Sequence, residues 1–313
     1  MTRRTDPLIL GACFTSNSPG LDVERLKVLV RSAERGKFDA LSFNALPDYF
    51  EALTLMSALA AVTDRIGLIA TPSDTEPFHI ARKLASLDHL SQGRAAWGVS
   101  ELHRERAEEL HDVVTGLWDS WDDEAFIRDK ASGRYFDPAR LHTLNHRGEH
   151  FSVRGPLNVA RPPQGHPVRV QVVTTETDIA LAARVADVIV TAHDALPAAQ
   201  GFYQAIKQRA AALGRDPKHL KILITDHSLS GTPSEVAERF EQWFQARACD
   251  GFQVHFPSCS DALHRFVDEV IPLLQQRGLF RHDYAASTLR EHLGLPRPAN
   301  RFSASTPAQA TVR

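Results

Sequence analysis

Short apolar runs rich in β-branched residues alternate along the chain with longer stretches in which apolar residues recur every three or four positions. Continuous apolar runs of this length are typical of strands buried on both faces of a parallel sheet, and the longer period is typical of amphipathic helices. Eight strands are predicted, at residues 8–14, 40–43, 66–70, 95–99, 168–173, 188–191, 221–225 and 251–256.

A helix is predicted after each strand. The helices cover residues 22–36, 52–62, 79–90, 105–121, a segment beginning near Thr175, 198–213, 234–246 and 261–277. Thr232 and Pro233 suit a helix start, and Gly214 and Gly278 suit helix ends. Eight strand–helix units in order predict an α/β fold, a closed (β/α)8 TIM barrel. An open doubly wound sheet is the alternative, although no G-x-G-x-x-G motif follows a strand.

The barrel is predicted to occupy residues 1–295 as a single domain. Residues 122–164 carry many Gly, Pro, His and Arg and no long apolar period, so they form an excursion between the fourth helix and the fifth strand. Residues 296–313 are rich in Pro, Ala, Ser and Thr, which predicts a mobile C-terminal tail.

Composition narrows the class of protein. The chain has 313 residues, 43% hydrophobic, and a formal net charge of −2, so neither nucleic acid nor an anionic membrane is expected as a partner. The cysteines, Cys13, Cys249 and Cys259, form no C-x-x-C motif, and their odd number argues against a disulfide framework. No apolar run is long enough to span a membrane, and Asp6 and Pro7 interrupt any signal peptide, so a cytoplasmic protein is expected.

Barrels bind ligands at the carboxyl ends of their strands. Residues expected there are Cys13, Phe14, Asn44, Thr71, Ser73, Ser100, Glu101, His103, Thr174, Thr175, His193, Asp194, Asp226, His227 and His255. Phe14, Phe43 and Phe256 suggest a partly apolar substrate, although core packing explains them equally well. A metal site from His193, Asp194, His227 and His255 is an alternative use of the strand ends.

Thr174 and Thr175 follow the fifth strand and open a helix, where free N–H groups and the helix dipole suit a phosphate. A capping box between Thr175 and Asp178 explains the same residues without a ligand. Asp178 would also place a negative charge beside any bound phosphate.

Several longer segments resemble one known family. They are Thr75–Arg94 (TEPFHIARKLASLDHLSQGR), Gly116–Trp121 (GLWDSW), Asp129–Pro138 (DKASGRYFDP), His146–Asn158 (HRGEHFSVRGPLN), Arg161–Gly165 (RPPQG) and Leu293–Pro298 (LGLPRP). These segments are similar to the nitrilotriacetate and dibenzothiophene-sulfone monooxygenase branch of the bacterial luciferase-like flavin-dependent monooxygenases. The resemblance runs, with gaps, from Arg35 to Arg301.

That resemblance implies a two-component system, in which a separate reductase supplies reduced FMN and the enzyme uses it with O2 to oxygenate a small organic substrate. It implies pairing of subunits, as a homodimer or as a heterodimer with a relative. Carried over residue by residue, it places Thr71 and Ser100 against the flavin ring and Thr174 and Thr175 at its phosphate, with Arg104 as a substitute contact. We expect His193, His227 and His255 to serve substrate polarity or proton transfer.

The chain also departs from the family's pattern. Ala45 stands where the family usually has Asp, Gly98 where it has Asn, and Arg104 where it has Tyr. The usual Gly-Ser-Ser of the phosphate loop is Val173-Thr174-Thr175, and the long insertions after the fourth and seventh strands are nearly absent. Three functions remain open: a flavin-dependent monooxygenase, a noncatalytic partner subunit of the same fold, and a metal-dependent barrel enzyme.

Overall fold

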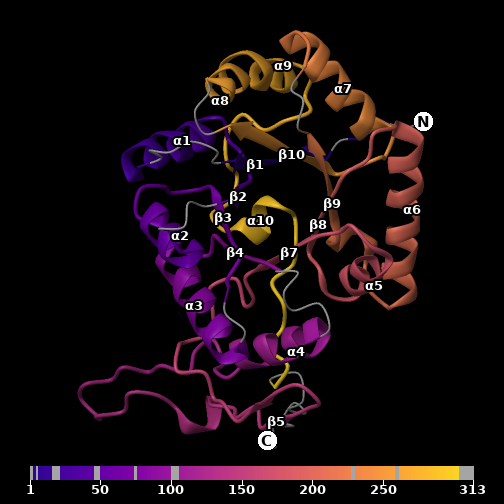
Figure 1. Cartoon of the computed structure of the whole chain (residues 1–313). Coiled ribbons are helices and arrows are strands. Elements are labelled where there is room, and N and C mark those ends of the chain that lie inside the picture. The colour runs from indigo at the N-terminus through magenta and orange to yellow at the C-terminus, as the bar shows by residue number, and fades with distance from the viewer. Residues whose placement is uncertain are drawn as a thin grey trace, which may run out of the picture.

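Eight parallel strands close into a barrel in the order β1-β10-β9-β8-β7-β4-β3-β2, which confirms the predicted (β/α)8 architecture (Figure 1). The computed structural model describes residues 3–4, 6–15, 22–45, 50–73, 76–99, 106–226, 230–257 and 261–302. The strands are β1 (Ile9–Thr15), β2 (Ala40–Ala45), β3 (Gly67–Ala70), β4 (Ala95–Gly98), β7 (Val168–Val172), β8 (Val188–Thr191), β9 (Lys221–Asp226) and β10 (Gly251–Pro257). Each overlaps one predicted strand.

Helices surround the barrel as an outer ring (Figure 1). They are α1 (Val23–Arg35), α2 (Ala52–Ala60), α3 (Pro77–Leu90), α4 (Ala107–Trp118), α5 (Glu176–Val185), α6 (Leu196–Ala212) and α7 (Pro233–Gln245). The eighth position is composite: α8 (Ala262–Arg265), a π-helical segment (Phe266–Val270) and α9 (Ile271–Gln276) replace the single helix expected over 261–277. Pro272 has no N–H to donate, and this break in the hydrogen-bond ladder lies where the π-helical turn meets α9.

Alternate side chains of the strands fill the barrel interior. This inner layer comprises Ile9, Ala40, Ala96, Val168, Val170, Val188, Val190 and Leu223. Three leucines from the C-terminal region, Leu289, Leu293 and Leu295, belong to the same cluster. Leu289 opens the short helix α10 (Leu289–His292), so a segment beyond the eighth strand–helix unit closes the amino-terminal end of the barrel.

The excursion between α4 and β7 extends away from the barrel as a long loop (Figure 1). It contains a 3-10 turn (Pro138–Arg140) and a two-stranded antiparallel sheet of β5 (His146–Arg147) and β6 (Ser152–Val153). A second 3-10 turn, Pro217–His219, precedes β9. Trp121 organises the base of the excursion, because its ring lies 4.6 Å from Phe126 and 5.3 Å from Phe136.

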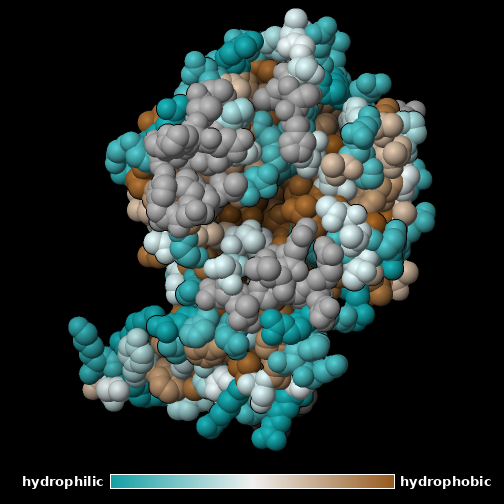
Figure 2. All heavy atoms as spheres, in the orientation of Figure 1, coloured by the Kyte–Doolittle hydropathy of each residue, from teal (hydrophilic) through white to brown (hydrophobic). Residues whose placement is uncertain are grey.

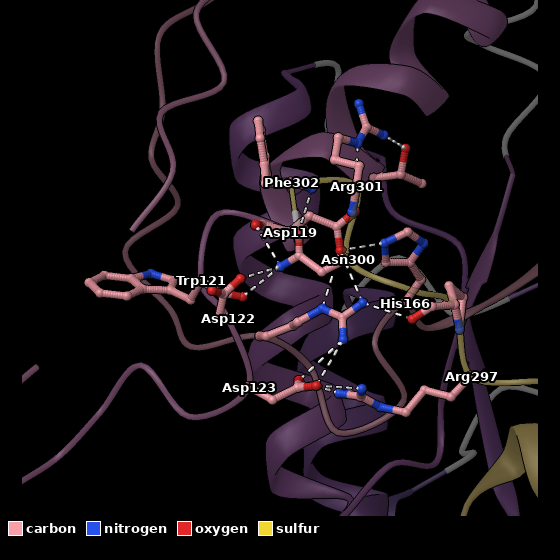
Figure 3. Close-up of polar contacts among 12 residues, drawn as sticks. Asp119, Trp121, Asp122, Asp123, His166, Arg297, Asn300, Arg301 and Phe302 are labelled. Atoms are coloured by element: carbon pink, nitrogen blue, oxygen red, sulfur yellow. Dashed lines mark hydrogen bonds and ion pairs between the residues drawn. The ribbon is translucent and has the colours of Figure 1, made fainter. Parts of the chain in front are cut away.

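Ordered contacts continue past the predicted domain boundary at residue 295, through Phe302 (Figure 3). Arg297 pairs with Asp123 at 2.5 Å, and the Asn300 amide donates to the carbonyl oxygens of Asp119 and Trp121, both at 3.1 Å. Phe302 stacks on His142 at 4.8 Å. Residues 296–302 are therefore held against the base of the excursion, which differs from the mobile tail expected from their composition.

Candidate functional site

The carboxyl ends of the barrel strands form a hollow face. Figure 2 shows this end of the barrel, and hydrophobic residues form the visible floor of the hollow. Val172, the last residue of β7, is 55% exposed, although most apolar residues of the strands are buried. An exposed apolar side chain beside a concave surface is typical of a site for an organic ligand.

Thr71 lies next to Gly98 at this end of the barrel. A Cβ atom placed on Gly98 would stand 2.2 Å from Thr71 Oγ1, so the hydroxyl rests directly over the glycine of β4. Thr71 is exposed on its other side. The glycine at position 98 thus makes room for the predicted flavin-facing threonine, and the two residues share one corner of the mouth.

Thr174 and Thr175 lie exposed between β7 and α5, as the sequence predicts. Their hydrogen bonds all converge on one oxygen, Asp178 Oδ2. It accepts from the Thr174 amide at 3.2 Å and hydroxyl at 3.1 Å, and from the Thr175 amide at 2.9 Å and hydroxyl at 2.8 Å. Thr175 Oγ1 in turn accepts from the Asp178 amide, which confirms the capping box that the sequence suggested.

This arrangement does not fit a phosphate. Burial alone would raise the pKa of Asp178, but the hydrogen bonds from Thr175 and Thr174 outweigh it and lower that pKa. Asp178 is therefore a carboxylate at neutral pH, with 6% of its surface exposed. It already holds the donors that a phosphate would need, and its charge would repel a second anion.

His193 lies on the helix side of β8 and not over the barrel interior. Its ring packs 5.0 Å from that of Phe202 on α6. Burial lowers the pKa of His193, and its Nε2 atom has no hydrogen-bond partner among the residues that the structure describes. A proton-transfer role for His193 stays a prediction, and it would require a ligand that reaches this outer layer.

His255 faces the barrel interior with a small polar cluster. It pairs in register with Cys13, and two residues earlier Gln253 pairs with Gly11. Gln253 Nε2 donates to Ser42 Oγ at 3.0 Å, and burial raises the pKa of the Cys13 thiol. Sequence analysis did not select Gln253, although a polar residue between Phe252 and Val254 in an apolar strand was the available signal.

The phenylalanines expected at the mouth lie elsewhere. Phe14 and Phe256 are fully buried, with ring centroids 6.2 Å apart, and Phe43 packs 5.5 Å from Phe14. Phe256 also packs 5.6 Å from Phe266 of the π-helical segment. These rings fill the layer between strands and helices, so they are not evidence for an apolar substrate.

A small cavity inside the barrel cannot serve as the ligand site. It has a volume of about 20 Å³ and is lined by Ile9, Val168, Leu223, Gln253 and Leu289, among others. That volume admits roughly one water molecule. Any organic ligand of the barrel must therefore lie in the open hollow at the mouth.

Three predicted site residues, Ser100, Arg104 and His227, lie outside the described residues. The segments that carry them are short, because β4 ends at Gly98 before α4 begins at Ala107, and β9 ends at Asp226 before α7 begins at Pro233. Within the described part of the chain, no three His, Cys, Asp or Glu side chains are grouped to hold a metal ion. No helix described there is long and apolar enough to cross a bilayer.

Comparison with known proteins gives the barrel its family. The family model described as luciferase-like monooxygenase matches residues 9–265. N-acetyl-S-(2-succino)cysteine monooxygenase of Bacillus subtilis is 37% identical, with 90% of this chain and 92% of that protein aligned.

Two subunits of pristinamycin IIA synthase from Streptomyces pristinaespiralis also match. One of them, the short subunit, is 40% identical over 308 positions, with 95% of this chain and 98% of that protein aligned. The other, the long subunit, is 33% identical over 400 positions, with 89% of this chain and 90% of that protein aligned.

Solved structures agree with these sequence matches. An EDTA monooxygenase from Chelativorans sp. BNC1 superposes with a TM-score of 0.82 at 27% identity, over 93% of this chain and 99% of that chain. A long-chain alkane monooxygenase superposes with a TM-score of 0.83 at 23% identity, which shows the shared fold. This chain therefore belongs to the luciferase-like monooxygenases, a family of oxidoreductase enzymes.

Proposed function

We propose that this chain is one subunit of a flavin-dependent monooxygenase, which uses reduced FMN from a separate flavin reductase, together with O2, to oxygenate a small organic substrate. Membership of the luciferase-like monooxygenases and the barrel with its open, partly apolar mouth support this proposal. Relatives named as monooxygenases of nitrilotriacetate, dibenzothiophene sulfone and N-acetyl-S-(2-succino)cysteine support the reaction class.

The observation that carries the subunit role is the pattern of alignment gaps. The Bacillus relative aligns over 406 positions with 90% of this chain, which is about 282 residues, so about 124 positions have no counterpart here. The short synthase subunit matches over 308 positions with 95% of this chain, about 297 residues, which leaves only about 11. The same long insertions are therefore missing from this chain and from the short subunit.

The long synthase subunit matches over 400 positions with 89% of this chain, about 279 residues, so it carries insertions of the kind that this chain lacks. We propose by analogy that this chain pairs with a longer relative of the same fold. A homodimer is the alternative assembly. The two are distinguished by the mass of the complex formed when the chain is produced with and without such a relative.

Two versions of this proposal differ in which chain holds the flavin. In the first version, FMN occupies this chain's own mouth, with Thr71 and Ser100 at the ring and Arg104, Thr174 and Thr175 at the phosphate end. His193, His227 and His255 then serve substrate polarity or proton transfer. Bound reduced flavin would supply the electrons that activate O2, and the walls of the mouth would limit access of water.

In the second version, the longer relative holds the flavin and this chain completes the assembly without binding FMN tightly. Two observations favour it. The donors of Thr174 and Thr175 are engaged by Asp178, and the short connections after β4 and β9 provide little chain to cover a bound flavin.

The experiment is to purify the chain alone and together with its longer relative, and to measure FMN binding and flavin-dependent O2 consumption for each. Binding by the chain alone at ~100 μM FMN supports the first version. Turnover by the pair, without binding by the chain alone, supports the second. If neither sample consumes O2 above the rate of free reduced FMN with any candidate substrate of the classes above, the monooxygenase proposal fails.

A further inference from the structure

The connection between β7 and α5 is where the family resemblance and the structure disagree most directly. The resemblance places the flavin phosphate at Thr174 and Thr175, whereas the structure shows both backbone amides and both hydroxyls directed at Asp178 Oδ2, at 2.8–3.2 Å. A hydroxyl or amide hydrogen that points at this oxygen is not available to a second acceptor at the same moment. The anion position at the start of α5 is thus taken by a side chain of the protein itself.

Asp178 is fixed in this position from several sides. It is the third residue of α5, its own amide donates to Thr175 Oγ1 at 3.3 Å, and its carbonyl oxygen accepts from Gln171 Nε2 at 3.3 Å. With 6% of its surface exposed, it cannot swing freely into solvent. A ligand phosphate would have to displace a carboxylate that is built into the helix start.

From this geometry we infer that Asp178 excludes the flavin phosphate from this chain, so that any flavin binding here gains nothing from the phosphate group. The inference rests on the proposed function, because it assumes that the hollow at the mouth is a flavin-sized site. It deepens the second version of that function: the FMN of the assembly is held by the longer relative, and this chain carries a helix start that is complete without an anion.

The matched pair FMN and riboflavin isolates the phosphate, because the two ligands share the ring and the ribityl chain. Dissociation constants are measured by fluorescence quenching for the wild-type chain and for Asp178→Asn, which removes the charge and retains the shape. For the wild-type chain we expect FMN to bind no tighter than riboflavin. For Asp178→Asn we expect FMN to bind at least ten-fold tighter than riboflavin, because the helix dipole and the threonine donors then face a phosphate without a competing charge.

Glu291→Gln is the matched control. Glu291 occupies the same capping-box position at α10, accepting from the Thr288 amide at 3.0 Å and hydroxyl at 2.9 Å, but α10 lies at the opposite end of the barrel. It removes one negative charge from a capping box without touching the mouth, so the ratio of the FMN and riboflavin constants should equal that of the wild-type chain. Asp178→Ser repeats the test with a smaller neutral side chain, in case Asp178→Asn folds poorly.

The outcomes separate this inference from the proposed function. A wild-type chain that binds FMN ten-fold or more tightly than riboflavin overturns the role of Asp178, while the monooxygenase proposal stands in its first version. Neutral variants at position 178 that fold but show no gain in FMN preference, or no FMN binding at all at ~100 μM, also overturn it. Failure of the proposed function shows instead as absence of flavin-dependent O2 consumption by the pair, whichever ratio is found.

Discussion

Removal of the Asp119 carboxylate should unfold the junction between the barrel and its excursion more readily than any surface change. Asp119 follows α4, with its side chain 1% exposed, and accepts from Arg161 at 3.2 Å, from the Arg301 amide at 3.3 Å and contacts His166 at 3.0 Å (Figure 3). The Arg161 side chain is itself 2% exposed. Asp119→Ala therefore leaves a buried guanidinium with only Asp123 as an ionic partner.

The expected loss is about 3–5 kcal/mol of unfolding free energy, the typical effect of removing one partner of a buried ion pair. For a chain of this size the urea midpoint should fall by about 1–2 M. Asp123→Ala is the control, because Asp123 contacts the same Arg161 but is 51% exposed, and an exposed pair contributes at most about 1 kcal/mol.

Urea unfolding followed by tryptophan fluorescence and by circular dichroism measures both variants. A double variant, Asp119→Leu with Arg161→Met, removes both charges and should recover most of the stability lost in Asp119→Ala. If Asp119→Ala unfolds within about 1 kcal/mol of the wild-type chain, or if Asp123→Ala costs as much, the burial argument is wrong.

Two other substitutions test separate parts of the structure. Burial, and then the charge of Arg169, lower the pKa of His111 to about 4. The unfolded chain therefore binds more protons between about pH 4 and 6.5, and stability should fall by about 2 kcal/mol from pH 7 to pH 5 through this group. His111→Gln should remove that part of the pH dependence, and equal slopes for both proteins would contradict the assignment. Leu289→Ala should cost about 2–5 kcal/mol because Leu289 is 1% exposed at the floor of the barrel. Leu213→Ala, at a 47% exposed position, should change stability by less than about 0.5 kcal/mol; equal effects at the two positions would mean that the leucine plug is not needed.

The strands were predictable because burial on both faces produces continuous apolar runs, and helices such as α1 were predictable because Leu26, Val30 and Ala33 repeat at the helical period. The capping box of Thr175 and Asp178 was also predictable, since it depends on residues three apart. Local patterns of this kind record local causes.

Other features depend on partners distant in sequence. The leucines of the barrel floor follow the last predicted helix, and nothing near Leu289 indicates that it packs against Gly67. The contacts of Arg297 with Asp123 join residues 174 positions apart, so composition alone suggested mobility there. His193 was assigned to the mouth from its place after β8, but strand alternation directs its ring toward Phe202 and α6.

The leucine plug and the pairing of β1 with β10 have a consequence for synthesis on the ribosome. Ile9 lies in register with Gly251, and the floor is complete only with Leu295. At the usual rates of translation, about 5–20 residues per second, roughly 15–60 s pass between the emergence of these ends. Throughout that interval the nascent barrel presents unpaired strand edges and an uncovered apolar lining, so its yield in cells should depend on molecular chaperones more than its folded stability would indicate.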